Sequence, residues 1–95
     1  MIELQPNDRF TINPSVRTRE LDDELIVLDL EQGEYFSLNG TGREVWNALG
    51  QGADLATVER DVCAHWPIPP DDAIPMITGL VRDLLERGLI ARRIG

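Results

Sequence analysis

Two β-rich runs joined by a short, glycine-containing connection constrain the fold of this chain more than any other feature. The runs cover residues 25–30 and 34–38, and they are connected by Glu31, Gln32 and Gly33. A glycine at the end of such a connection can take the positive φ that a short hairpin loop requires. The pattern therefore predicts an antiparallel β-hairpin.

The register of this hairpin decides which side chains face the core, because successive side chains of a strand point to opposite faces. We expect Leu30 to lie opposite Glu34. Leu28 then lies opposite Phe36, and Ile26 lies opposite Leu38. The predicted core face then comprises Ile26, Leu28, Phe36 and Leu38, and the predicted half-exposed face comprises Val27, Asp29, Tyr35 and Ser37.

Shorter alternating runs precede the hairpin, at residues 9–13 and 16–19, and Pro14 separates them. Proline cannot donate a hydrogen bond to a neighbouring strand, so this segment is typical of an edge strand or of a strand with an irregular exit. We expect it to complete a three-stranded antiparallel sheet. For the tail, residues 89–94, a short final strand and a frayed end both stay open.

Three helical patterns follow the strands. In each, apolar residues recur at helical spacing between a capping residue and a glycine or proline that ends the helix. Strands first and helices second predict an α+β fold, organised as one domain over residues 1–95. The predicted helices run from a cap at 39–42 to about Leu49, from Asp54 or Thr57 to Pro67, and from Asp71 and Asp72 to Gly88.

The third predicted helix has a wide apolar face, which covers nearly half of its circumference. A helix that packs on one neighbour needs only a narrower stripe. Either the first two helices cover the whole face, or part of it lines an exposed groove. We expect a groove, because a small sheet leaves little with which to cover the helix.

The charge composition excludes several functions. The net charge is −8 and all nine basic residues are arginine, so the chain has no lysine for a Schiff base or a phosphate-binding loop. Nucleic-acid binding depends on several Lys or Arg contacts with phosphate, which an acidic chain disfavours. We therefore expect no nucleic-acid partner.

The sequence offers no convincing catalytic or metal-binding set. Cys63 and His65, the one cysteine and the one histidine, are two residues apart on a predicted helix and point to different sides. They are poor partners for nucleophilic catalysis and too few for a zinc site. The acidic clusters at 20–24 and 71–72 lack the spacing of a calcium-binding loop. We expect no enzymatic activity, no metal and no cofactor.

The chain also lacks the signals of membrane insertion and export. No apolar run approaches the roughly 18 residues that cross a bilayer. Residues 1–8 lack the basic and then apolar layout of a signal peptide. We expect a cytoplasmic protein without a membrane partner.

A binding surface is the function that remains. Residues 34–38 form a candidate edge strand, and an extended peptide can pair with the free backbone groups of such an edge. The third helix is expected beside this strand, so a peptide would lie in a cleft between them. The alternative is an edge that is protected by a loop or by a homodimer, and the residues alone do not decide between the two.

Residues 27–46 resemble the PqqD-like family, whose members include leader-recognition proteins of pyrroloquinoline quinone and lasso-peptide biosynthesis. The resemblance rests on a hairpin with an aromatic pair at 35–36, a Leu-Asn pair at 38–39, a glycine-containing turn, and a helix with Trp46. It extends over about residues 16–93. It implies a winged-helix-like domain of three antiparallel strands followed by three α-helices.

The resemblance also implies a non-catalytic RiPP recognition element, a peptide chaperone for the leader segment of a ribosomally synthesised precursor peptide. The leader would pair as an extra antiparallel strand with the third strand and pack against the third helix. Gly79 favours one flank of that helix over the flank of Ile74, Val81 and Leu85, because a missing side chain allows another backbone to approach. The expected leader-binding residues are Val27, Asp29, Glu34, Tyr35, Phe36, Ser37 and Leu38 in the hairpin, and Met76, Gly79, Leu80 and Asp83 on the helix.

A chain of this length has no room for a second domain, so we expect it to deliver the leader in trans to a maturation enzyme. The resemblance favours a lasso-peptide leader protease. A PqqD-type chaperone for a radical enzyme and a winged-helix regulatory module are the alternatives. The regulatory module predicts a basic third helix, whereas Arg82 and Arg87 there are outnumbered by acidic residues.

Overall fold

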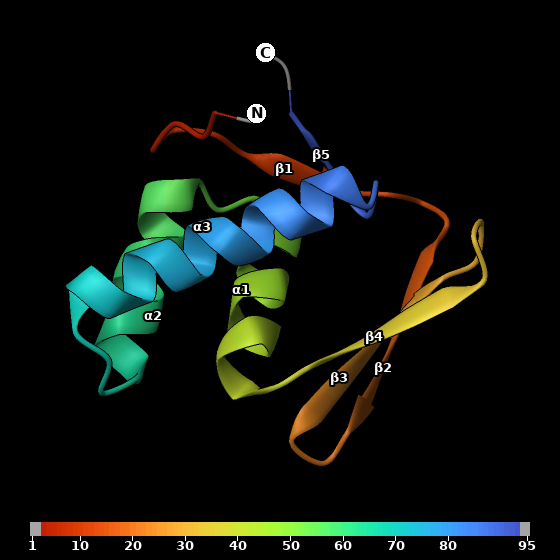
Figure 1. Ribbon diagram of the computed structural model, residues 1–95, viewed down its shortest axis with the longest axis horizontal. Helices are drawn as coiled ribbons and strands as arrows, with labels where there is room; N and C mark the ends of the chain where they lie inside the picture. The colour runs from red at the N-terminus through yellow and green to blue at the C-terminus, as the bar shows by residue number, and fades with distance from the viewer. Residues whose placement is uncertain (1–2, 94–95) are drawn as a thin grey trace.

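The computed structural model describes residues 3–93. Figure 1 shows a twisted sheet at one side of the molecule and three helices at the other. The elements in chain order are β1 (Phe10–Ile12), β2 (Val16–Leu21), β3 (Glu24–Asp29), β4 (Glu34–Leu38), α1 (Gly40–Gly50), α2 (Leu55–His65), α3 (Pro70–Glu86) and β5 (Ile90–Arg92).

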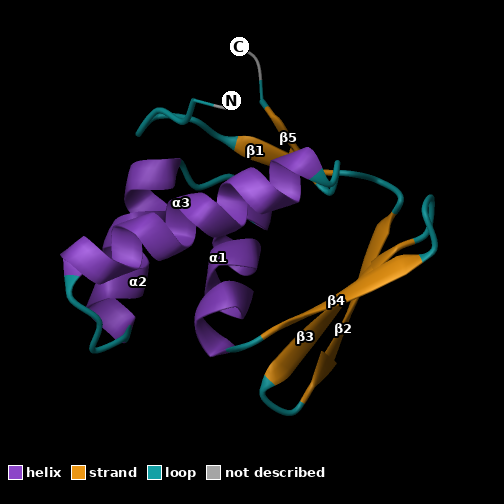
Figure 2. Cartoon of the chain, in the orientation of Figure 1, coloured by secondary structure: helices purple, strands orange, loops and turns teal. Residues whose placement is uncertain are grey.

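The main sheet is antiparallel with the order β2-β3-β4, and the three helices follow it in the chain. The predicted α+β class, a three-stranded antiparallel sheet followed by three helices, is therefore confirmed. Figure 2 shows the sheet nearly edge-on, with α1 beside its inner face, α3 crossing in front of α1, and α2 on the side away from the sheet. No helix within residues 3–93 covers the other face of the sheet.

The hairpin of β3 and β4 pairs one residue away from the predicted register, so that prediction is wrong. Asp29, and not Leu30, lies opposite Glu34, and Val27 lies opposite Phe36. A shift of one residue turns every side chain of one strand to the other face. The inward side chains of β3 are Leu25, Val27 and Asp29, and the outward ones are Ile26 and Leu28.

The predicted exposure of four β3 residues is wrong for the same reason. Val27 is 0% exposed and Asp29 6%, although both were expected on the half-exposed face. Leu28 is 37% exposed and Ile26 is half-buried, although both were expected in the core. In β4, Phe36 and Leu38 keep the inward direction that was predicted, because the shift moves β3 relative to β4 and leaves the alternation within β4 unchanged.

Asp29 explains the register. Its carboxylate Oδ1 accepts hydrogen bonds from the backbone N–H groups of Glu31, at 3.0 Å, and of Gln32, at 3.2 Å. Its carbonyl oxygen accepts from the N–H of Gly33, at 2.8 Å, and Gly33 takes a φ of +71°. A buried carboxylate is costly unless it is hydrogen-bonded, and the loop backbone supplies these bonds. The connection is therefore a four-residue loop, 30–33, closed around Asp29.

A second, two-stranded sheet joins the two ends of the chain. β1 pairs with β5, so that Phe10 lies opposite Arg92 and Ile12 opposite Ile90. The segment before Pro14 is therefore not part of the main sheet. Of the two alternatives for the tail, the structure shows the short strand, and residue 93 is the last described residue after it. Residues 1–2 and 94–95 of the predicted domain, including Ile94 of the tail, lie outside the described residues.

The predicted helix starts are close to the observed ones. Asn39 and Asp54 cap α1 and α2, and the N–H of Thr57 donates to Asp54 at 2.9 Å. α3 begins at Pro70. Proline is suited to the first helical position because its missing N–H is not needed there. One core lies between the helices and the inner face of the sheet, and it includes Phe10, Val27, Val45, Trp46, Leu49, Val58, Val62, Ile77, Val81 and Leu89.

Candidate functional site

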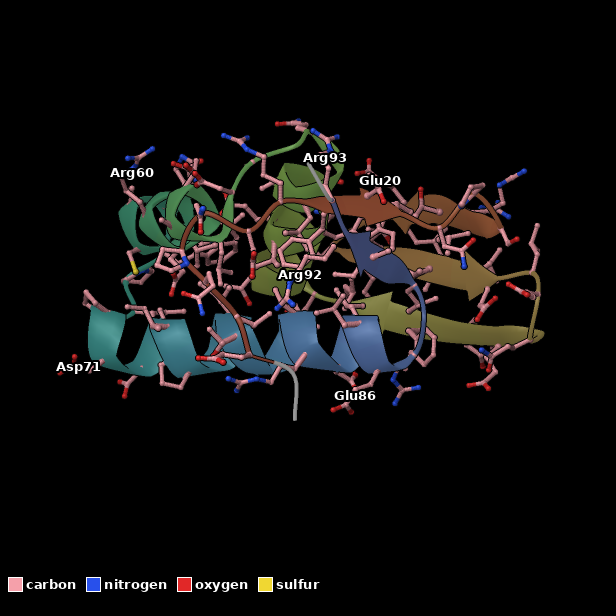
Figure 3. The ribbon with its side chains drawn as sticks, turned by 90° about the horizontal axis from the view of Figure 1, so that it is seen from above. Glu20, Arg60, Asp71, Glu86, Arg92 and Arg93 are labelled. Atoms are coloured by element: carbon pink, nitrogen blue, oxygen red, sulfur yellow. The ribbon has the colours of Figure 1, made fainter. Side chains whose placement is uncertain are left out.

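β4 is an edge strand of the main sheet. Among the described residues it pairs only with β3, and its other edge faces α3 (Figure 3). In an antiparallel strand, alternate residues direct their N–H and C=O groups to opposite neighbours. The free edge of β4, residues 34–38, therefore presents backbone donors and acceptors to an incoming extended chain.

A pocket of about 320 Å³ lies between the end of β4, the start of α1 and one side of α3. This volume is near the lower end of the roughly 300–1,000 Å³ that is typical of ligand sites. The described residues that line it are uncharged and mostly apolar, so the pocket favours apolar side chains. They are Ser37, Leu38, Asn39, Thr41, Gly42, Val45, Met76, Ile77 and Leu80.

Local sequence explains why these residues meet. β4 ends at Leu38, and the Asn39 side chain caps α1 at once by accepting from the N–H of Gly42 at 3.5 Å. The first turn of α1 therefore forms the floor of the pocket beside the end of β4. On α3, Met76 and Leu80 are four residues apart and lie on the same side of the helix. Met76 is 42% exposed, so its side chain is accessible to a ligand in the pocket.

A second contact joins β4 to α3 beyond the pocket. The guanidinium of Arg87, directly after α3, lies 4.4 Å from the centre of the Phe36 ring, within the range of a cation–π contact. Arg87 Nε also forms an ion pair with Asp83 Oδ2 at 3.1 Å. Phe36 of the hairpin and Asp83 of α3 were both predicted to bind the leader. Each of them contacts Arg87, which therefore links the two.

The structure places the predicted site residues in four groups. Ser37, Leu38, Met76 and Leu80 meet at the pocket, and Phe36 and Asp83 meet at Arg87. Glu34 and Tyr35 are exposed on β4, and Gly79 is exposed on α3 with no atom within 4 Å of an added Cβ. Val27 and Asp29 are buried and do not line the cleft.

Of the two flanks of α3, only the flank of Met76 contributes to the pocket. Val81 is fully buried in the core, and Leu85 is partly buried against it. Ile74 is 41% exposed and lies outside the pocket. Ile74 and Met76 thus have nearly equal exposure on one helix but different positions relative to the cleft.

Six contributors to the cleft were not predicted as site residues: Asn39, Thr41, Gly42, Val45, Ile77 and Arg87. Asn39 was predicted only as a helix cap. Because it is the single residue between β4 and α1, the first turn of α1 lies beside the end of β4. Arg87 carries a weaker signal, because an arginine four residues after Asp83 predicts an ion pair on a helix. Neither signal predicts the pocket, because the pocket also depends on where α3 crosses β4.

Cys63 and His65 do not form a pair. His65 Nδ1 lies 2.5 Å from Glu44 Oε1, and the other oxygen of Glu44 accepts from Trp66 Nε1 at 3.0 Å. Glu44 therefore joins α1 to the end of α2. In residues 3–93, no group of three or more His, Cys, Asp or Glu side chains is arranged to hold a metal ion.

Two carboxyl groups of α2 and its cap have altered acidity. Hydrogen bonds from Thr57 lower the pKa of Asp54, which fits its role as a helix cap. Partial desolvation raises the pKa of Glu59. Neither residue lines the pocket.

No helix within the described part of the chain has both the length and the apolar character of a membrane span.

Comparison with known proteins places these features in context. The sequence profile of the family described as Coenzyme PQQ synthesis protein D (PqqD) matches residues 24–90. The structure of lasso peptide synthetase B1 complexed with the leader peptide has 28% identity and a TM-score of 0.79, over 87% of this chain and 98% of that one.

The structure of TbiB1 in complex with the TbiA(beta) leader peptide has 24% identity and a TM-score of 0.79. It covers 90% of this chain and 99% of the other, and at this identity the likeness supports the fold alone. No curated protein sequence matches the chain. The family match covers both β3 and β4 and all three helices, which are the elements around the cleft.

Proposed function

The chain belongs to the PqqD family, and from this premise we propose that it binds the leader segment of a ribosomally synthesised precursor peptide. The leader adds as an antiparallel strand to the free edge of β4. One observation carries the proposal: this edge borders an apolar pocket that is completed by Met76 and Leu80 of α3. A backbone template beside a side-chain pocket is the arrangement that strand-addition domains use.

The two parts of the cleft have different roles. Backbone groups of residues 34–38 supply hydrogen bonds that any sequence can make, so they contribute affinity without much specificity. The pocket at Leu38, Met76 and Leu80 selects an apolar side chain of the leader. The Phe36 ring and Arg87 provide a further surface beyond the pocket. A leader that loses its apolar residues keeps only the backbone contribution.

The strand geometry predicts which leader residues matter. Side chains of the added strand alternate, so those at positions i and i+2 point toward α3 and those between them point to the other face of the sheet. The peptide also loses conformational freedom when it binds, which offsets part of the contact energy. We expect a dissociation constant in the micromolar to nanomolar range, about −8 to −12 kcal/mol.

We also propose that the domain acts in trans, without catalysis of its own, by raising the effective concentration of precursor at a maturation enzyme. The similar structure of lasso peptide synthetase B1 with its leader peptide supports a lasso-peptide pathway, in which a leader peptidase is the partner. The whole chain, 1–95, forms the recognition domain in this proposal. A homodimer through β4 would compete with the leader for the same edge.

Calorimetric titration with a synthetic leader peptide tests the proposal. The leader comes from a precursor gene beside the gene for this chain, and a second peptide carries alanine at its apolar positions. We expect dissociation constants of micromolar or below for the first peptide and a loss of at least about tenfold for the second.

Two variants of matched exposure locate the site. Met76→Ala should weaken leader binding by about tenfold, whereas Ile74→Ala should leave it within about twofold, because only Met76 lines the pocket. Equal losses in both variants would place the peptide elsewhere on α3. An absence of binding to any neighbouring precursor would remove the proposed function.

A further inference from the structure

The C-terminal end of α3 brings a charged side chain to the free edge of β4. Arg87 directly follows α3, and its guanidinium lies 4.4 Å from the centre of the Phe36 ring. α3 faces the free edge of β4 (Figure 3), so Arg87 reaches Phe36 from the side on which the proposed leader strand adds. Phe36 is the middle residue of β4 and is two residues away from Leu38 at the pocket.

The guanidinium of Arg87 is held in place but keeps most of its donors. Arginine has five N–H donors in a planar group. Nε donates to Asp83 Oδ2 at 3.1 Å, and the Phe36 ring lies against one face of the group. The N–H groups of Nη1 and Nη2 have no acceptor within residues 3–93, and the side chain is 43% exposed. The group is therefore preorganised to donate hydrogen bonds to a ligand.

An added strand supplies acceptors at this place whatever its sequence. In an antiparallel strand, alternate residues direct their C=O groups to one neighbour, and the residues between them direct theirs to the opposite side. In a leader strand paired with β4, the second set points toward α3. If the residue that enters the pocket lies opposite Leu38, the residue two positions further along the leader lies opposite Phe36. A leader carbonyl in this stretch is then close to Arg87.

The charges around Arg87 favour a neutral acceptor over a carboxylate. Asp83 already neutralises Arg87. Glu34 lies two residues from Phe36 on the same face of β4, and Glu86 directly precedes Arg87. The whole chain carries a net charge of −8. An acidic leader side chain would place a further like charge among these carboxylates, which is unfavourable. A backbone carbonyl accepts from the charged donor without this repulsion.

We propose that Arg87 is a specificity-determining residue of the leader cleft, whose Nη groups donate hydrogen bonds to a backbone carbonyl of the leader beside Phe36. The inference rests on the proposed function and adds a contact of a different kind from the pocket. The pocket selects a side chain, whereas Arg87 recognises extended backbone. A leader that turns directly after its pocket residue presents no carbonyl at Arg87. The contact therefore selects leaders that stay extended for about two more residues.

Arg87→Met tests the contact from the protein side. Methionine keeps an unbranched side chain beside Phe36 and removes every donor, and Arg87→Ala is a second variant in case methionine disturbs the fold. Arg19→Met is the matched control, because Arg19 is exposed on β2, lies outside the pocket and carries the same charge. In calorimetry with the synthetic leader, we expect about tenfold weaker binding by Arg87→Met and binding within about twofold of the parent chain by Arg19→Met.

Backbone esters in the leader identify the acceptor. Alanine substitution of each apolar leader residue first identifies the pocket residue. One of the three amide bonds that follow it is then replaced by an ester, whose carbonyl is a weaker acceptor. The ester also removes an N–H on the β4 side, so each peptide is measured with the parent chain and with Arg87→Met as a double-mutant cycle. We expect one ester to weaken binding to the parent chain at least about threefold more than binding to Arg87→Met, and no such difference at the bond beside it.

Salt separates a carbonyl from a carboxylate as the acceptor. Attraction between exposed opposite charges weakens as the Debye length falls from about 10 Å at 0.1 M salt to about 3 Å at 1 M. The ratio of the leader affinities of the parent chain and Arg87→Met should therefore change less than about twofold between these concentrations. A leader with Asn and Gln in place of Asp and Glu should give the same ratio.

Each contrary result has a distinct meaning. Equal leader affinity in the parent chain and in both Arg87 variants overturns the contact and leaves recognition at the pocket standing. A loss that disappears with the leader lacking Asp and Glu assigns Arg87 to a carboxylate instead. A loss without a difference at any ester also overturns the backbone contact. A parent chain that binds no leader removes the proposed function and this inference with it.

Discussion

Replacement of Gly79 by alanine separates the stability of α3 from its proposed role in leader binding. Gly79 lies in the interior of α3, is exposed, and has no atom within 4 Å of the position that an added Cβ would take. A glycine inside a helix costs about 0.8–1.0 kcal/mol relative to alanine. Gly79→Ala should therefore raise the free energy of unfolding by about this amount.

The expected rise in melting temperature follows from the size of the domain. For a domain of this length, 1 kcal/mol corresponds to about 4–8 °C. Thermal unfolding followed by circular dichroism measures it. Gly40→Ala is the opposing control, because its Cβ would lie 2.5 Å from the Trp66 ring and overpacking costs about 1–3 kcal/mol. We expect Gly40→Ala to lower the melting temperature.

Leader affinity should change in the opposite direction to stability in Gly79→Ala. If the leader backbone approaches α3 at Gly79, the new methyl group overlaps it, and a cost of about 1–3 kcal/mol weakens binding roughly 5- to 150-fold. Calorimetry with the synthetic leader measures this loss. A variant that is more stable and binds the leader as tightly as the parent chain would refute the close approach at Gly79.

Two further predictions concern stability. Asp29→Ala should destabilise the domain by about 1–3 kcal/mol in urea denaturation, because it leaves the loop N–H groups of Glu31 and Gln32 without their acceptor; an unchanged midpoint would contradict the register argument. In acid, the folded-state pKa of Asp54 lies below its unfolded value, so its stabilisation is present above about pH 4 and is lost as pH falls. Below about pH 4, the free energy of unfolding of the parent chain should therefore fall more steeply with decreasing pH than that of Asp54→Asn. The same pH dependence in both proteins would contradict the prediction.

The helices were predictable because their signals are local. Asn39 and Asp54 cap the helices that follow them, and Val45 and Leu49 fall on one stripe of α1 whatever else the chain does. The pairing of β1 with β5 is different, because it joins residues about 80 positions apart and no local pattern specifies it. The pocket belongs with this second class, since it depends on where α3 crosses β4.

The error in register shows which parts of a site prediction are robust. Alternation within β4 does not depend on its partner, so Phe36 and Leu38 kept their predicted inward direction. The directions assigned to β3 depended on the length of the loop, and Asp29 lengthened that loop by one residue because its carboxylate binds the loop backbone. Ser37, Leu38, Met76 and Leu80 thus line the pocket, whereas Val27 and Asp29 lie in the core.

The same shift decides which side chains of β3 the outer face of the sheet presents. In the predicted register, Ile26 and Leu28 would have been buried, and the outer face would have carried Val27 and Asp29 beside Tyr35. The actual register buries the Asp29 carboxylate within its own loop and turns Ile26 and Leu28 outward, between the arginines of β2 and the Tyr35 and Ser37 side chains of β4. Exposing Leu28 to 37% instead of burying it forgoes part of the roughly 1.5–3 kcal/mol that full burial of a leucine contributes.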